Sequence, residues 1–218
     1  IAHGKNGAWF PQFSPTAEHL HAVWGTSPLH AVAVGDNGTI ITFNGATWTQ
    51  EEAPATEHLY GVWGTSPDNM VAVGQNVVLR RSSAGWTAFE NAPFTTLRAV
   101  WGPSATTFTA VGDDGKTWTW NDGWFTEVLT TSGLALRSIH GPLSGDVWLV
   151  GAKGPVFLKS SKPKAEGGTD GKWVQQDVPT TEQLNAVHAA DSGEVFVAGS
   201  RCELLRYDGF GWTSQKAP

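Results

Sequence analysis

The sequence predicts an all-β fold made of a repeat of about 40 residues. Five segments of the form Leu-x-x-Val-Trp-Gly, or a close variant, begin 39, 38, 39 and 48 residues apart. Each is followed by a second apolar run that ends in glycine, then by a third short run, a turn and a tryptophan. No window has a sustained helical period. Four short strands per repeat of this length are typical of a β-propeller blade.

The repeat defines the expected order of strands. The first strands begin near residues 20, 59, 97, 136 and 184. The second strands end in glycines that we expect to adopt a conformation closed to other residues: Gly35, Gly74, Gly112, Gly151 and Gly199. Asn-Gly or Asp-Gly pairs, suited to tight hairpins, lie between the third and fourth strands of most repeats.

Residues 1–19 match the end of a repeat and therefore predict an N-terminal half-blade before five full blades. We predict one propeller domain over residues 1–218, with five blades favoured and six allowed. In the five-blade arrangement the terminal strands compete for the same place, which would permit oligomers formed by strand exchange.

The tryptophan after each hairpin is expected to fill the wide space between adjacent blades. This predicts a core role for Trp9, Trp48, Trp86, Trp124, Trp173 and Trp212. Trp120 lies outside the repeat pattern, and we expect it at the surface. The sole cysteine, Cys202, is expected to be a small buried strand residue.

The turn-plus-tryptophan hairpins resemble the Asp-box of the sialidase-like (BNR) propellers, and the segment from Thr42 to Trp48 comes closest. The longer repeat is similar to repeats common in secreted and surface lipoproteins of myxobacteria. The resemblance covers essentially the whole chain. It implies a fold but no activity, because propellers of this kind include lectins, assembly factors, adhesins and enzymes.

Composition excludes several classes of function. The chain has 14 basic and 20 acidic residues, a net charge of −6 and no basic cluster, which disfavours nucleic-acid binding. Its longest apolar runs are far too short to insert in a membrane. A single cysteine excludes an internal disulfide framework. Neither a Walker motif, nor His-Glu-x-x-His, nor Gly-x-Ser-x-Gly occurs, and we expect no cofactor.

Candidate site residues lie on the first strands, which would border the central channel. The second position is polar or amphipathic in every repeat: His21, Tyr60, Arg98, Arg137 and Asn185. The fifth position holds Trp24, Trp63, Trp101, His140 and His188. These two positions should face opposite sides of the strand, near opposite ends. Except for Asn185, all of these residues are our candidates for ligand contact.

His140 and His188 are equivalent positions of adjacent blades and are weak candidates for a shared metal ion, with Asp146 and Glu194 as nearby carboxylates. The alternative is that each histidine replaces tryptophan as a flat, hydrogen-bonded filler. Asp36, Asp113 and the residues after them are expected to serve the turns rather than bind Ca²⁺. His19 and His58 are expected to be loop residues.

These patterns favour a non-catalytic binding module, secreted or held in the bacterial cell envelope. Its ligand would be a carbohydrate, in a lectin-like or adhesive role, or a protein, in a scaffold role. The alternative is an enzyme or metal-binding propeller with a site at the channel mouth around His140 and His188. Sequence alone does not identify the ligand.

Overall fold

The computed structural model spans residues 1–218 and describes all of them except 6, 130–132, 143–144, 161, 167 and 216–218. The described ranges form strands and two short 3₁₀ turns, and no helix in them could cross a membrane. Contacts divide the chain into two compact units, unit 1 (Ile1–Phe94) and unit 2 (Thr95–Pro218). The boundary falls between the second and third repeats. The single-domain organisation over both units stays a prediction.

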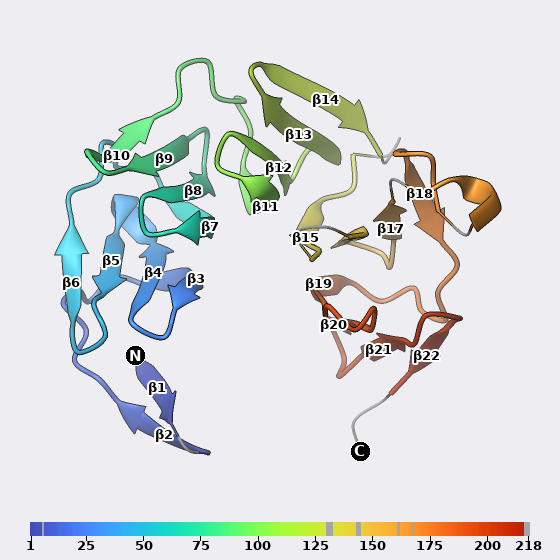
Figure 1. Ribbon diagram of the computed structural model, residues 1–218, viewed down its shortest axis with the longest axis horizontal. Helices are drawn as coiled ribbons and strands as arrows, with labels where there is room; N and C mark the ends of the chain where they lie inside the picture. The colour runs from blue at the N-terminus through green and yellow to red at the C-terminus, as the bar shows by residue number, and fades with distance from the viewer. Residues whose placement is uncertain (6, 130–132, 143–144, 161, 167, 216–218) are drawn as a thin grey trace. The chain divides into compact units, whose positions relative to one another are not determined.

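Unit 1 contains a two-stranded hairpin and two four-stranded antiparallel sheets in which consecutive strands pair. We call β1–β2 the half-blade, β3–β6 blade 1 and β7–β10 blade 2. The strands are β1 (Ala2–Lys5), β2 (Ala8–Pro11), β3 (Leu20–Ser27), β4 (His30–Gly35), β5 (Ile40–Phe43), β6 (Trp48–Glu51), β7 (Leu59–Ser66), β8 (Asn69–Gly74), β9 (Val78–Ser82) and β10 (Gly85–Ala88). Blades 1 and 2 lie side by side, with their first strands β3 and β7 in contact (Figure 1).

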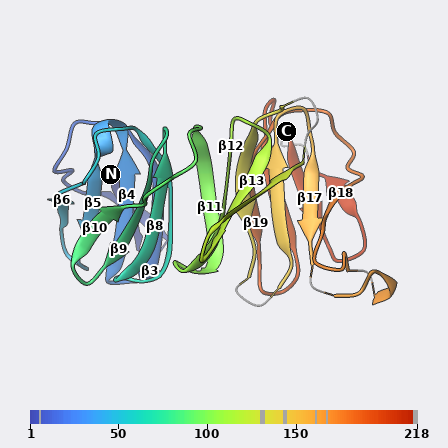
Figure 2. The same cartoon turned by 90° about the horizontal axis from the view of Figure 1, so that it is seen from above.

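Unit 2 contains three sheets of the same kind, blade 3 (β11–β14), blade 4 (β15–β18) and blade 5 (β19–β22). Its strands are β11 (Leu97–Ser104), β12 (Thr107–Gly112), β13 (Lys116–Asn121), β14 (Trp124–Val128), β15 (Leu136–His140), β16 (Val147–Gly151), β17 (Val156–Lys159), β18 (Trp173–Gln176), β19 (Leu184–Ala189), β20 (Val195–Gly199), β21 (Leu204–Tyr207) and β22 (Trp212–Ser214). Figure 2 shows the strands of each unit from the side, running next to one another. The five predicted repeats and the half-blade are therefore present as sheets.

The core of each unit lies between neighbouring blades, because alternate side chains of a strand point to opposite faces of its sheet. One buried cluster joins blades 1 and 2: Val32, Val34, Ile40, Leu59, Val62, Met70, Ala72, Val77, Leu79 and Trp86. Another joins blades 4 and 5: Trp148, Val150, Val156, Leu158, Leu184, Val187, Ala189, Val195, Val197 and Leu205. Face-to-face packing of four-stranded meanders is the packing of propeller blades.

The glycine that ends each second strand is required for a reason other than the predicted one. Gly35 has a φ of −164°, which is extended backbone open to any residue. A Cβ there, however, would lie 2.0 Å from the carbonyl oxygen of His19, and Gly74 has the same clash with His58. The prediction of a special conformation is wrong at Gly35. The close approach of the chain just before the first strand excludes a side chain instead.

The tryptophans after the hairpins divide into covered and uncovered positions. Trp86 is 8% exposed, and its Nε1 donates a 2.9 Å hydrogen bond to Glu51 of the preceding blade. Trp48 donates in the same way to Gln12, at the end of the half-blade. Trp9 is 76% exposed, so its predicted core role is wrong.

The other four of these tryptophans, Trp124, Trp173, Trp212 and Trp48, are half-buried. Trp120 is also half-buried, and its ring packs edge-to-face on that of Trp124 at 5.3 Å. Trp120 is therefore only partly exposed, because this cross-strand neighbour covers one side of its ring. Cys202 is exposed in the turn before β21, with a φ of 60°, so the prediction of a buried strand cysteine is wrong too.

Candidate functional site

The second position of every first strand is the extra residue of a β-bulge. In blade 1, Leu20 pairs with Gly35 and Ala22 with Val34, which leaves His21 without a partner in the ladder. The register shifts at the same place in the other four blades. A bulge re-aims the side chain of its extra residue and often lies beside a functional site. In each of the five blades, the bulge therefore turns the second-position side chain of the first strand out of the regular ladder.

In unit 1 this position contributes to a group that we call the His patch: His21, Asp36, His58 and Tyr60. His21 Nε2 lies 2.7 Å from Oδ1 of Asp36, and His58 Nδ1 lies 3.0 Å from the same oxygen. The ring of Tyr60 is 5.1 Å from the His21 ring. The hydrogen bond with His21 holds the pKa of Asp36 below its ordinary value. One carboxylate thus links imidazoles of two neighbouring blades.

In unit 2 the same positions form the Arg patch: Arg98, Asp113 and Arg137. Arg98 holds Asp113 through two hydrogen bonds, Nε to Oδ1 at 3.0 Å and Nη2 to Oδ2 at 2.6 Å. Arg137, from the next blade, places Nη1 3.9 Å from Oδ1 of Asp113. All three side chains are about one-third exposed. The patch is a bidentate ion pair with a second, looser cation beside it.

Sequence reasoning identified four members of these patches and missed three. It placed His21, Tyr60, Arg98 and Arg137 at a polar position of the first strand. It assigned Asp36 and Asp113 only to turns and His58 only to a loop. A signal was present, since an aspartate follows the glycine at the end of the second strand in blades 1 and 3. The pairing of Leu20 with Gly35 puts that aspartate beside the second position.

The fifth-position side chain is buried or half-buried in blades 1 to 4, whereas His188 of blade 5 is exposed. Trp63 and Trp101 are 2% and 7% exposed, so little of either ring is open to a ligand. Trp24 is half-buried and donates from Nε1 to the carbonyl oxygen of Gly64 at 2.7 Å. His140 accepts at Nδ1 from the backbone N–H of Ala189 at 3.1 Å. Gly64 and Ala189 occupy the sixth position of the next first strand, so the two contacts are equivalent.

His140 and His188 do converge, with ring centroids 4.5 Å apart and an angle of 32° between the rings. Burial lowers the pKa of His140, and repulsion from His188 lowers it further. The expected carboxylate neighbour Glu194 instead pairs with Arg206. Among the described residues, no group of three His, Cys, Asp or Glu side chains could hold a metal ion. The ring contact and the hydrogen bond of His140 fit the filler hypothesis, and the role of the pair stays a prediction.

Asn185, the second-position residue of blade 5, is exposed, and its Oδ1 accepts a 2.6 Å hydrogen bond from Gln183. It therefore joins neither patch in the described structure. The structure brings His21 together with Tyr60, Arg98 with Arg137, and His140 with His188.

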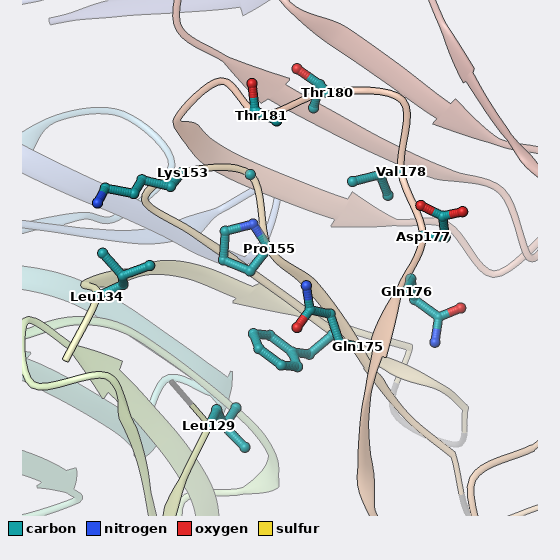
Figure 3. A pocket seen from close by; sticks show the side chains of 12 residues that line it. Leu129, Leu134, Lys153, Pro155, Gln175, Gln176, Asp177, Val178, Thr180 and Thr181 are labelled. Atoms are coloured by element: carbon teal, nitrogen blue, oxygen red, sulfur yellow. The ribbon is translucent and has the colours of Figure 1, made fainter. Parts of the chain in front are cut away.

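Unit 2 also has a groove of about 440 Å³ beside β17 and β18, shown in Figure 3. Its apolar lining comes from Leu129, Leu134, Pro155, Phe157 and Val178. Side-chain amides and hydroxyls of Gln175, Gln176, Thr180 and Thr181 surround it. None of the candidate residues from the sequence lines this groove, and it has no tryptophan on which a sugar ring would stack.

Solved structures similar to this chain are β-propellers. A catalytically inactive variant of virginiamycin B lyase from Staphylococcus aureus, in complex with quinupristin, has a TM-score of 0.78 at 11% identity over 96% of this chain and 74% of that chain. YCF48 bound to D1 peptide has a TM-score of 0.68 at 15% identity over 93% and 68%. The β-propeller domain of Cps50 (Swd1) from Myceliophteria thermophila has a TM-score of 0.67 at 9% identity over 91% and 72%.

The fold is a β-propeller. The predicted fold class is therefore confirmed, and identities of this size show the fold alone. No family model and no curated protein matches the sequence. The finer resemblance to Asp-box repeats and to myxobacterial surface proteins stays a prediction.

Proposed function

We propose that the chain is a non-catalytic binding module for a protein ligand, and that the His patch of unit 1 and the Arg patch of unit 2 are separate contact sites. The observation that supports this most directly is the bulge at the second position of all five first strands. It turns polar and aromatic side chains out of the ladder while leaving them partly exposed. A secreted or surface-bound scaffold is the setting that we propose, from the resemblance given above.

A peptide or protein ligand fits the chemistry of the patches better than a sugar does. Arginine, tyrosine and histidine are half-exposed there, and arginine and tyrosine are enriched where proteins bind one another. The lectin-like role relied on tryptophan rings open for stacking, and the rings of Trp63 and Trp101 are largely covered. YCF48, one of the similar propellers, is described as bound to a peptide, which supports a protein ligand for this chain as well.

The test is a random peptide array probed with the purified wild-type protein and with two single variants. Tyr60→Ala removes a half-exposed ring of the His patch. Phe210→Ala, at a turn where the ring is 98% exposed, is the matched control outside both patches. We expect a set of related peptides whose binding falls at least about tenfold in Tyr60→Ala and is unchanged in Phe210→Ala.

Equal loss in both variants, or no selected peptides, would contradict the proposal. A glycan array probed with the same three proteins decides between ligand classes. Glycan binding that depends on Trp24 or Tyr60, without peptide binding, would replace the protein ligand by a carbohydrate.

An enzyme is the second candidate, because His140 has a lowered pKa beside His188 and one similar structure is a lyase. The double substitution His140→Ala/His188→Ala tests it. The binding proposal expects folded protein with the same metal content, by elemental analysis, before and after the change. Stoichiometric zinc, copper or iron that disappears in the double variant would favour the enzyme.

A further inference from the structure

Arg137 has no aspartate of its own blade to pair with, unlike the second-position residues of blades 1 and 3. In blades 1 and 3 an aspartate follows the glycine at the end of the second strand, and it pairs with the second-position side chain. In blade 4 the corresponding residue after Gly151 is Ala152. Arg137 therefore reaches back to Asp113 of blade 3, at 3.9 Å, which is longer than a hydrogen bond.

Asp113 is already committed to another guanidinium. Both of its carboxylate oxygens accept hydrogen bonds from Arg98, Oδ1 from Nε and Oδ2 from Nη2. Within the described chain, Nε of Arg137 has no hydrogen-bond partner. By contrast, Arg81 in unit 1 donates to Glu51 at 3.0 Å and is only 17% exposed. Nε of Arg81 also has no partner, so the two arginines differ in their carboxylates: Arg81 is hydrogen-bonded to Glu51, whereas Arg137 lies beyond hydrogen-bond distance of Asp113.

Charge in the Arg patch is unbalanced by one. Two guanidinium groups surround one carboxylate, and arginine stays protonated at any physiological pH. The Arg137 side chain is 32% exposed, so a group from solution can approach it. A second carboxylate would neutralise the excess charge and would fit the planar fork of a guanidinium. One carboxylate would bring the patch to charge balance, whereas a phosphate dianion would leave it with a net negative charge.

We propose that Arg137, with Arg98 beside it, binds a carboxylate of the protein ligand. This rests on the proposed function and specifies its chemistry. Arg137 is the contact residue, and Asp113 is a positioning residue that fixes Arg98. The carboxylate comes either from an acidic side chain or from the C-terminus of the ligand, and the two sources share the same chemistry.

The direct test uses small probes of each source at constant ionic strength. N-acetylglycine carries a terminal carboxylate, N-acetylglutamate α-amide carries a side-chain carboxylate, and N-acetylglutamine α-amide is the neutral control. Backbone amide shifts in ¹⁵N-labelled protein report binding at Arg137. We expect saturable shifts with one or both carboxylates and none with the neutral probe.

Three variants make the test specific. Arg137→Gln should weaken probe binding about tenfold or more, as for loss of a charge-assisted hydrogen bond. Arg137→Lys should retain part of the binding, since it keeps the charge without the fork. Arg201→Gln removes an 83% exposed arginine paired with Glu182 and should change nothing. Equal effects of Arg137→Gln and Arg201→Gln, or shifts that never saturate, would overturn the inference.

The peptide array separates this inference from the proposed function. Peptides that lose binding when their acidic residues become amides, or when their C-terminus is amidated, support a carboxylate contact provided that Arg137→Gln removes the preference. Selected peptides that need Tyr60 but ignore Arg137 and carboxylates would leave the protein-binding function in place and overturn the carboxylate site. Probe binding at Arg137 with no selected peptide would support the carboxylate site and overturn the protein-binding function.

Discussion

Units 1 and 2 join their blades at equivalent positions with opposite chemistry. In unit 1, Trp24 donates a hydrogen bond to the carbonyl oxygen of Gly64. In unit 2, His140 accepts one from the backbone N–H of Ala189. The repeat sets where one first strand meets the next, and the side chain sets the direction of the bond. Of these two joints, only the histidine joint contains a titratable side chain.

The same difference recurs at the patches. A single aspartate bridges two blades in each unit, but its partners are imidazoles at Asp36 and guanidiniums at Asp113. Unit 2 therefore has a permanent positive charge for a ligand, because its guanidinium groups stay protonated.

The largest expected effect concerns the core joint of blades 1 and 2. Trp86→Ala should destabilise the protein by about 3–5 kcal/mol, because it empties a buried aromatic site. Trp9→Ala, at the equivalent position of the half-blade, should cost less than about 1 kcal/mol, since that ring is exposed. Urea unfolding followed by tryptophan fluorescence measures both changes. Equal losses would show that the half-blade ring is covered in solution.

A smaller loss of stability is expected from removing the indole N–H group, and it should differ between two tryptophans. Trp86 donates to Glu51, whereas Nε1 of Trp212 in blade 5 has no partner in the described structure. Trp86→Phe should cost about 1.5–3 kcal/mol, the value of a hydrogen bond to a charged group, beyond the loss of ring area. Trp212→Phe should cost clearly less in the same urea experiment. A larger loss for Trp212→Phe would mean that its N–H group is bonded in solution.

The blade order was predictable from the sequence because glycines, turns and apolar runs recur in register. The uncovered ring of Trp9 was not, because its environment depends on a neighbouring blade and not on its own repeat. The His and Arg patches were partly predictable from the sequence. Their second-position members were visible as polar residues in an apolar strand. The roles of Asp36 and Asp113 needed the register of β3 with β4 and of β11 with β12, which composition does not reveal.

The histidine joint predicts a pH dependence that the tryptophan joint lacks. Burial lowers the pKa of His140, so the unfolded chain takes up a proton at this residue at a higher pH than the folded chain. Stability should therefore fall as the pH drops below about 6.5, until the folded protein is protonated as well. His140→Gln should reduce the change in urea midpoint between pH 7.5 and pH 5.5. His19→Gln, an exposed histidine, should leave that change as in the wild type.

The smallest expected effect concerns Asp36, because its site is open to solvent. The hydrogen bond with His21 lowers the pKa of Asp36 in the folded protein, so this carboxylate contributes stability above its ordinary pKa of 3.8. That contribution should be lost as the pH falls through the lower, folded value. Asp36→Asn should therefore lower the urea midpoint slightly at pH 5 and by less at pH 2.5. Asp122→Asn, at a hairpin turn outside both patches, serves as the control and should not show this convergence. If the deficit of Asp36→Asn stayed the same at both pH values, the carboxylate charge would not hold the two histidines, and the contrast between the patches would reduce to the extra cation at Arg137.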